Sequence, residues 1–505
     1  MALPTVSRRY FFFGAMAAPV PLAGYGSVAS LRALGYKPYY DKLNVAAVGC
    51  GARGAAILNE AARTENITAL CDVDEARAAE SFQRFAKAPK FKDFRVMLEK
   101  EGKNIDAVTV GIPDHMHATV ALACMQMGKH VYVEKPLTRT PWEARLLADA
   151  AVKYKVATQM GNQGYSHESI RVASEMLWSG AIGDVKEVHV SSSPGTHPTA
   201  MQQLPDESSV PKNLDWDLWL GGASMRAYAP DHYAPYNWRG YFDFGTGQLG
   251  NWGIHSMGPV NMALQLEAPV SVELIRQEGA SKYTFPSRAV IRFDFPARGA
   301  MPPVSVYWHD SARVGDAEAY KVPGMENENI LPPSDNLTSK GRPMGSSEER
   351  RGPARRRDPN APRQGAGGPG VKVFGEPGSP SAPGVLTSNG AVFVGSKGMM
   401  ATVSRGEGVH LLPEARWREY KLPPQLLTRS PGHMMDWIRY AKGGEASCSH
   451  FGIAGPYVEW MMLGVIAFRV PGKLNWDSKN LRFTNSVEAN KYVKPVFRKG
   501  WELKL

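Results

Sequence analysis

Three consecutive residues, Glu134-Lys135-Pro136, have the types and order needed to move a proton. They follow the apolar run of residues 131–133, so we expect them at the end of a buried strand. A lysine held there beside a carboxylate can exchange a proton near neutral pH, because burial and charged neighbours shift its pKa. Lys135 is therefore the first candidate for acid–base chemistry.

A glycine-rich turn lies upstream of this lysine. Residues 42–49 form an apolar stretch typical of a central parallel strand, and residues 49–54 then fit G-x-G-x-x-G before a predicted helix at 55–63. Such glycines let the backbone approach a pyrophosphate, and the helix N-terminus offers it free N–H groups. We assign these positions to dinucleotide binding: Gly49, Gly51, Arg53 and Gly54.

The next predicted strand, residues 67–72, ends in an acid, Asp72. A carboxylate at this point accepts hydrogen bonds from the adenosine ribose hydroxyls and repels a 2′-phosphate. NAD is therefore the expected cofactor. NADP is the less favoured alternative, which the nearby Arg77 could accommodate.

Polar residues also follow the later predicted strands. In an open parallel sheet, ligands bind beyond the carboxyl ends of the strands. The cofactor candidates at these ends are Pro113, His115, His117, Glu134, Lys135 and Asn162. For His117 the alternative is a cap at the start of a helix over residues 118–127.

Further candidates lie in the middle of the chain. Asn251 and His255 are four residues apart, so on a helix both could point into one pocket. Trp238, Arg239 and Asp243 could hold a sugar, because aromatic faces cover its C–H side and charged groups bind its hydroxyls. The alternative is that the aromatic side chains belong to the core and the charges are paired.

Taken in order, the glycine turn, residues 113–117, Glu134-Lys135-Pro136 and residues 160–163 resemble the Gfo/Idh/MocA oxidoreductase family. Residues 433–438, 454–456 and 488–492 resemble a bacterial branch of it. The resemblance implies an α/β fold: a Rossmann dinucleotide-binding domain followed by an α/β domain with a large open mixed sheet. It also implies bound NAD(P), a sugar or polyol substrate and a homo-oligomer formed through the open sheet.

The resemblance places catalytic roles on Lys135 and His255 and makes Tyr165 a substrate candidate. The family pattern has Asp where Asn251 stands. An amide can hold a hydroxyl but cannot take its proton, so Lys135 and His255 remain the titratable pair.

We therefore expect an NAD-dependent oxidoreductase that transfers a hydride between nicotinamide and a hydroxyl-bearing carbon of a sugar or polyol. One alternative is a redox-neutral NAD-dependent glycosidase, in which oxidation, elimination, water addition and re-reduction follow one another; residues 255–260 resemble the His-x-x-Gly-Pro-Val stretch of such enzymes. Another is a catalytically silent sugar-binding protein, because fold alone does not fix function.

Composition restricts the partners. The chain has 505 residues and a formal net charge of +11. Much of the excess is local: residues 341–363 hold seven arginines against three acids, and residues 8–37 hold Arg8, Arg9, Arg32 and Lys37. A nucleic-acid partner is therefore not expected. The four cysteines show no zinc-ligand spacing, so no metal site is expected.

The expected domain boundaries are inferred from changes in composition along the chain. Residues 1–35 contain Ser7-Arg8-Arg9 before a short apolar stretch, which resembles a twin-arginine export signal and suggests a periplasmic or otherwise exported protein. No stretch is long enough for a membrane span. Residues 40–160 should form the Rossmann domain, and 161–310 with 384–505 the second domain. The Pro/Gly/Arg-rich residues 311–383 are predicted to be a disordered insertion.

Overall fold

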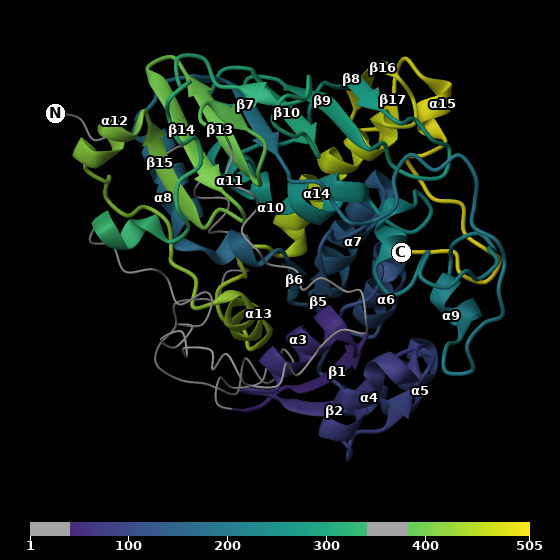
Figure 1. Ribbon diagram of the computed structural model, residues 1–505. Coiled ribbons are helices and arrows are strands. Elements are labelled where there is room, and N and C mark those ends of the chain that lie inside the picture. The colour runs from purple at the N-terminus through teal and green to yellow at the C-terminus, as the bar shows by residue number, and fades with distance from the viewer. Residues whose placement is uncertain (1–40, 341–381) are drawn as a thin grey trace, which may run out of the picture.

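The computed structural model describes residues 41–340 and 382–505. The predicted export signal lies outside these residues, as does most of the predicted insertion. Two sheets organise the described chain (Figure 1). The smaller one is wholly parallel, and the larger one is mostly antiparallel. The predicted α/β fold class is confirmed.

The first sheet has the strand order β3-β2-β1-β4-β5-β6. Its strands are β1 (Asn44–Val48), β2 (Asn66–Cys71), β3 (Lys90–Phe91), β4 (Ala107–Val110), β5 (His130–Glu134) and β6 (Thr158–Gly161). Its helices are α3 (Ala52–Ala61), α4 (Glu75–Arg84), α5 (Phe94–Glu101), the short η1 (Gly102–Asn104), α6 (Asp114–Gln126) and α7 (Pro141–Tyr154). β4 and most of β1 and β5 are buried, because helices cover both faces of a parallel sheet.

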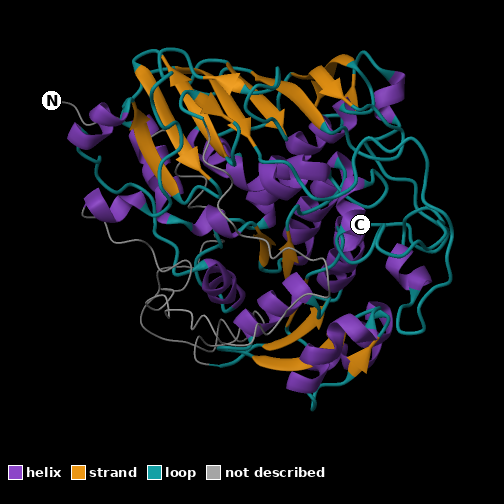
Figure 2. Ribbon diagram, in the orientation of Figure 1, coloured by secondary structure: helices purple, strands orange, loops and turns teal. Residues whose placement is uncertain are grey.

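The second sheet has the order β15-β14-β13-β7-β10-β9-β8-β16-β17. Its strands are β7 (Val185–Ser191), β8 (Ser271–Glu278), β9 (Arg288–Phe295), β10 (Val304–Asp310), β13 (Gly390–Gly395), β14 (Gly398–Val403), β15 (Gly408–Leu412), β16 (Gly472–Asp477) and β17 (Arg482–Phe483). Helices lie on its inner face, and its outer face points away from the first sheet (Figures 1 and 2).

Helices of the second half fill the space between the two sheets or lie at its margins. They are η2 (Gln163–Ser166), α8 (Glu168–Trp178), α9 (Trp216–Leu220), η3 (Asn237–Gly240), η4 (Leu249–Gly253), α10 (Ile254–Ser256), α11 (Gly258–Ala263), α12 (Glu414–Glu419), α13 (His433–Ala441), α14 (Phe451–Ala467) and α15 (Val487–Asn490). The apolar α14 packs against α7 on one side and β8 on the other, which ties the two domains together. Arg145 of α7 makes a two-pronged ion pair with Glu459 of α14, at 2.8 Å for each bond.

Part of the predicted disordered insertion is packed. Residues 311–340 contain β11 (Tyr320–Lys321), which pairs with β12 (Val385–Leu386), and the short η5 (Asn336–Lys340). Val322 and Ile330 are buried against the outer face of β13 to β15. The prediction is wrong for this stretch, because its few apolar residues are spaced to cover an existing sheet face. The remainder, residues 341–381, lies outside the described residues.

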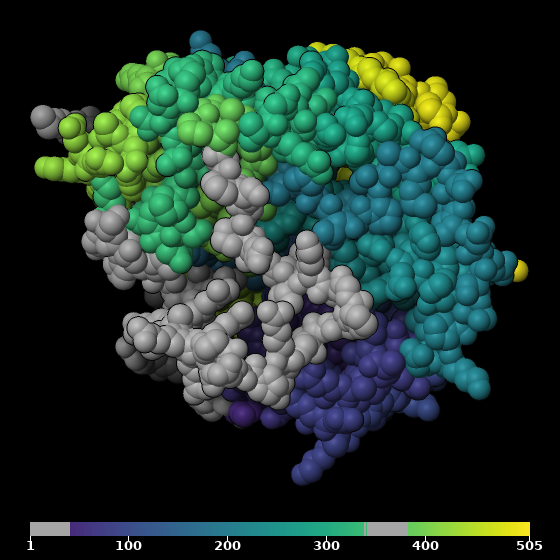
Figure 3. All heavy atoms as spheres, in the orientation of Figure 1, coloured from purple at the N-terminus to yellow at the C-terminus, as the bar shows by residue number. Residues whose placement is uncertain are grey.

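The loop between β7 and η4 crosses to the first domain. Asp215 N–H donates to Val73 O at 2.9 Å, and Glu75 N–H donates to Asn213 O at 3.0 Å. This loop, teal in Figures 1 and 3, runs down one side of the molecule to α9. It thereby brings residues of the second domain to the carboxyl ends of the first sheet.

Candidate active site

The glycine turn after β1 is built for close backbone approach. Gly49 has φ +88°, and a Cβ there would lie 2.3 Å from Gly111 O. A Cβ on Gly54 would lie 2.2 Å from Gly49 O. No side chain caps the N-terminus of α3, which begins directly after Gly51. The cradle and the uncapped N–H groups fit a dinucleotide pyrophosphate.

Asp72 directly follows β2, and both of its carboxylate oxygens are held in place. Cys50 N–H donates to one oxygen at 2.7 Å, and Asp74 N–H donates to the other at 2.9 Å. Burial raises the pKa of Asp72, and these two donors oppose that shift. The carboxylate is thus fixed beside the glycine turn, where a ribose contact requires it. Arg77 is exposed on α4.

The two histidines after β4 are used in backbone contacts. The Nδ1 and Nε2 atoms of His117 lie 2.7 Å from Pro136 O and 2.8 Å from Ile112 O, so the ring joins the ends of β4 and β5. His117 lies inside α6, whose N-cap is Pro113, so the predicted alternative of a capping residue is wrong. His115 Nε2 lies 2.9 Å from Trp219 O, in an aromatic cluster. Burial lowers the pKa of His115 to about 3.

Glu134, at the end of β5, accepts hydrogen bonds from three groups. Its Oε1 accepts from Arg53 Nε at 2.7 Å and from Gln163 Nε2 at 3.2 Å, and its Oε2 accepts from Lys135 N–H at 3.3 Å. Burial alone would raise the pKa of this carboxyl, but Arg53 and Lys135 outweigh it and lower the pKa. The ion pair connects the helix of the glycine turn to the strand that holds Lys135.

Lys135 is half-buried and reaches toward the second domain. Its Nζ donates to Asn251 O at 2.7 Å and to Asn251 Oδ1 at 2.8 Å. Burial lowers the pKa of Lys135 to about 7; Arg239 and Arg405 also lower it, and Glu134 and Asp114 oppose the shift. A lysine in this state can accept or donate a proton at neutral pH.

Asn251 and His255 lie on a distorted helix rather than on the regular one that their spacing predicts. Residues 249–253 form a π-helical turn, in which Ile254 N–H donates to Leu249 O, and α10 follows. The wider turn changes the relative direction of the two side chains. Asn251 nonetheless binds Lys135, and the charge of Lys135 acts on His255.

His255 is buried and neutral at physiological pH. Burial lowers its pKa well below the usual value, and the charges of Lys135 and Arg405 lower it further. Its Nδ1 has no hydrogen-bond partner among the described residues. An orphaned polar atom on a ring that the charge of Lys135 reaches fits a site that a ligand completes.

Asn162 follows β6 and is held by the carboxyl-terminal part of the chain. Its Oδ1 accepts from Ser449 Oγ at 2.6 Å, while its buried Nδ2 has no partner in the part of the chain that the structure describes. The unpaired amide N–H fits a cofactor contact.

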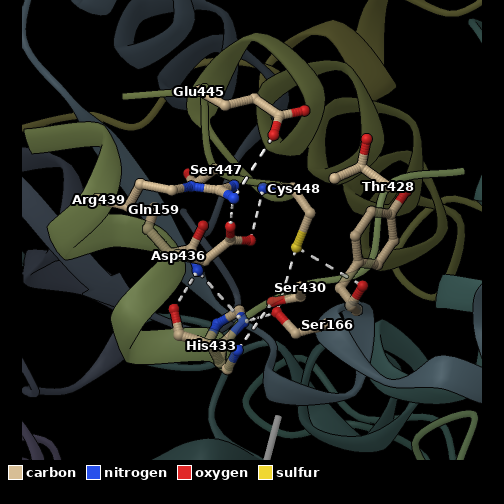
Figure 4. A network of polar contacts seen from close by, with 12 residues as sticks. Gln159, Ser166, Thr428, Ser430, His433, Asp436, Arg439, Glu445, Ser447 and Cys448 are labelled. Carbon is tan, nitrogen blue, oxygen red and sulfur yellow. Dashed lines mark hydrogen bonds and ion pairs between the residues drawn. The ribbon is translucent and has the colours of Figure 1, made fainter. Parts of the chain in front are cut away.

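The neighbouring network in Figure 4 anchors α13 against β6 and η2. His433 Nδ1 lies 2.7 Å from Ser166 Oγ, and its Nε2 lies 2.9 Å from Met160 O. Asp436 accepts from Cys448 N–H at 3.0 Å and from Arg439 at 2.6 Å. These bonds fix the loop that contains Ser449.

The four predicted substrate residues do not form one group. Trp238 is buried in an aromatic cluster, and Arg239 lies over its ring. Asp243 forms an ion pair with Arg226. Tyr165 is buried beside α11, where its hydroxyl accepts from Asn261 Nδ2 at 3.0 Å. Of the four, Arg239 is the one whose charge acts on Lys135.

Several side chains at the site were not predicted from the sequence. Thr246 donates to the buried Asp114 at 2.7 Å, and Asn251 Nδ2 donates to Gln248 Oε1 at 2.9 Å and to Tyr236 OH at 3.4 Å. Arg405, after β14, lies with its guanidinium carbon 5.8 Å from the Trp252 ring centre. Asp114 could have been found, because it stands beside two residues already singled out. The others lie outside any motif.

The described ranges show neither a cluster of metal ligands nor a membrane-spanning helix. No group of three His, Cys, Asp or Glu side chains is placed to hold a metal within residues 41–340 and 382–505. Over the same ranges, no helix has the length and apolar character needed to cross a membrane. All four cysteines are free thiols.

Comparison with protein families fits this architecture. Residues 43–162 match the NAD-binding Rossmann fold of the Gfo/Idh/MocA oxidoreductase family, and residues 170–285 match a C-terminal α/β domain of the same family. These adjoining matches support the Gfo/Idh/MocA family. The first domain is an NAD-binding Rossmann domain.

Individual relatives match parts of the chain. Levoglucosan dehydrogenase of Pseudarthrobacter phenanthrenivorans is 32% identical over 23% of this chain and 29% of its own length. Inositol 2-dehydrogenase 2 of Saccharopolyspora erythraea is 30% identical over 36% of this chain and 55% of its own length. A glycosyl hydrolase family 109 protein of Shewanella baltica is 28% identical over 34% of this chain and 39% of its own length. The matches thus span at most about half the length of these relatives.

The fold is shared with solved structures. The WlbA dehydrogenase of Bordetella pertussis, crystallised with NADH and UDP-GlcNAcA, superposes with a TM-score of 0.52 at 13% identity. The likeness covers 86% of this chain and 99% of that one. At this identity the likeness concerns the fold.

Proposed function

We propose that this protein is an NAD-dependent oxidoreductase that transfers a hydride between nicotinamide and a hydroxyl-bearing carbon of a sugar or polyol. The observation that carries the proposal is the position and the lowered pKa of Lys135. This lysine has a pKa of about 7 and follows the strand end that also carries Glu134, next to the glycine cradle of an NAD-binding domain. Two partial relatives, levoglucosan and inositol dehydrogenases, support the substrate class.

The chemistry requires that the hydroxyl lose its proton as the hydride leaves the same carbon. NAD, when bound, supplies the hydride acceptor. Neutral Lys135 would take the hydroxyl proton, and its cationic form would return the proton in the reverse direction. Asn251 holds Nζ by two hydrogen bonds, which fixes the direction of the lysine. Neutral His255 can accept or donate a second hydrogen bond to the same hydroxyl.

The first test identifies the nucleotide released from the purified protein and then follows the absorbance of reduced nicotinamide after sugars and polyols are added. We expect NAD and a rise in that absorbance with at least one of them. Retained NAD with no hydride transfer to or from any sugar would contradict the proposal and favour a catalytically silent binding protein.

A second candidate is a redox-neutral glycosidase. The match to glycosyl hydrolase family 109 proteins favours it, as does the His-Ser-Met-Gly-Pro-Val sequence of residues 255–260. In that reaction the hydride returns to the sugar, so no net reduced nicotinamide accumulates. Release of free sugar from an aryl glycoside, without added NAD and without net NADH, would distinguish it from a dehydrogenase.

Export by the twin-arginine route remains part of the proposal, supported by Arg8-Arg9 before a short apolar stretch. The test is fractionation of cells that produce the full chain or the Arg8→Lys, Arg9→Lys variant. We expect export of the first and retention of the second. Equal distribution of the two proteins would refute this route.

A further inference from the structure

Arg239 is the unusual charge of the site. Its guanidinium carbon lies 4.0 Å from the Tyr236 ring centre and 4.2 Å from the Trp238 ring centre. Its hydrogen bond within the described chain is Nη1–H to Tyr236 O at 3.3 Å. No carboxylate of residues 41–340 or 382–505 lies within ion-pair distance of it.

Neighbouring arginines behave differently. Arg53 is paired with Glu134, and Arg226 is paired with Asp243. Asp114 acts on Arg239 electrostatically, but its carboxylate already accepts a hydrogen bond from Thr246. Arg239 is half-buried, and burial lowers its pKa although Tyr236, Asp114 and Glu134 oppose that shift. Because no carboxylate of the described residues forms an ion pair with it, its guanidinium remains able to bind an anion from outside the chain.

The position of Arg239 relates it to the proton-transfer group. Lys135 Nζ is bonded to Asn251 Oδ1 at 2.8 Å, Asn251 Nδ2 lies 3.4 Å from Tyr236 OH, and Arg239 stacks on the Tyr236 ring. Arg239 therefore lies one aromatic ring beyond the group that holds Lys135. A sugar whose hydroxyl reaches Lys135 would extend along Tyr236 toward the guanidinium.

Two cations and two acids act on Lys135. Arg239 and Arg405 both act on it, and the two acids that oppose them, Asp114 and Glu134, each already accept a hydrogen bond from another side chain. A planar guanidinium binds carboxylate or phosphate oxygens in pairs, whereas neutral hydroxyls do not offset its charge.

We infer that the substrate is an anionic sugar or polyol derivative, with a carboxylate or phosphate bound by Arg239 while a hydroxyl of the same molecule meets Lys135. The inference rests on the proposed function and narrows it from sugars in general to sugar acids or sugar phosphates. It also replaces the expectation that Arg239 binds the hydroxyl groups of a sugar.

The test compares binding of matched probes to the NAD-loaded protein by calorimetry. The probes are D-glucuronate and D-galacturonate against D-glucose and D-galactose, with glucose 6-phosphate and galactose 6-phosphate as the phosphate arm. We expect at least one anionic probe to bind about tenfold more tightly than its neutral partner. The arm that shows the preference identifies the anion as carboxylate or phosphate.

Variants then assign the preference to Arg239. Arg239→Gln should remove the preference with NAD affinity unchanged, and Arg239→Lys should keep part of it. The exposed Lys282, which lies over Tyr283, offers a control of equal charge change, and Lys282→Gln should leave the preference intact.

The inference is overturned if neutral and anionic probes bind alike, if no anionic probe binds, if the preference survives in Arg239→Gln, or if Arg239→Gln weakens NAD binding instead. Hydride transfer is measured separately. A neutral sugar that reduces NAD with no anionic preference would leave the proposed function standing, whereas anionic binding without any hydride transfer would refute the function alone.

Discussion

The two sides of the site are built in different ways. On the Rossmann side, the functional groups stand at the ends of regular strands, and the charges are paired, as in Arg53 with Glu134. On the substrate side, the groups come from a long loop and a π-helical turn, and Arg239 has no carboxylate partner among the described residues. The charges on the cofactor side are thus neutralised within the chain, and only uncharged N–H groups there are left for a ligand, whereas the substrate side also leaves a charge for a ligand to neutralise.

The largest effect should come where the two sides meet. Lys135→Ala removes the proton-transfer group, and turnover should fall roughly 10²- to 10⁴-fold with NAD still bound. His255→Ala should act in the same direction. Steady-state kinetics and the bound nucleotide content measure both effects. Lys129, whose Nζ donates to Gly102 O at the other end of β5, provides the control Lys129→Ala. Unchanged turnover in both site variants would refute the assignment.

The next effect isolates the cofactor side. Gly54→Ala would place a Cβ 2.2 Å from Gly49 O, so the cradle must open and NAD affinity should be lost. Calorimetry with NAD measures it, and thermal unfolding reports the accompanying loss of stability. In the control Gly102→Ala, the new Cβ meets the flexible methyl of Met127. Wild-type NAD affinity in Gly54→Ala would show that the dinucleotide does not lie at this turn.

A smaller effect should come from changing Asn251, the residue of the substrate side that affects the pKa of Lys135. Oxidation needs neutral Lys135, so its rate should rise as pH increases through about 7, and the reverse reaction should fall over the same range. Asn251→Asp adds a carboxylate beside Nζ, which favours the charged lysine and should raise the midpoint by about one pH unit. Rate profiles against pH in both directions measure it. An unmoved or lowered midpoint would mean that another group titrates.

The smallest effect concerns a bond at the edge of the cofactor side. Ser449→Ala removes the hydrogen bond that orients Asn162, so NAD affinity should weaken about two- to tenfold. The matched control is Ser447→Ala in the same loop, because Ser447 Oγ donates to Thr158 O instead. If both variants bind NAD like the wild type, Asn162 has no part in holding the cofactor.

The difference between the two sides also explains what the sequence could predict. Glycine turns and acids at strand ends follow from local backbone requirements, so Gly49, Asp72 and Lys135 could be placed from their neighbours along the chain. The π-helical turn could not, because the spacing of Asn251 and His255 suits an ordinary helix equally well. Arg405 and Ser449 are brought to the site by contacts between segments far apart in the chain, for which a single sequence has no signal.

The segment that was wrongly predicted to be disordered has a further consequence. Val322 and Ile330 of this segment, together with Leu386 just after it, cover the apolar part of the outer sheet face. Tyr320 stacks on His189 with ring centres 3.4 Å apart. The adjoining part of that face is polar: Asp294 accepts from Ser271 at 3.1 Å and from Ser305 at 2.8 Å, and Arg292 pairs with Glu273.

A second copy of the chain would therefore find little apolar surface on this part of the face to bury. If the protein forms the expected homo-oligomer through these strands, charged and hydroxyl groups must supply the contact, and its dissociation should depend steeply on salt.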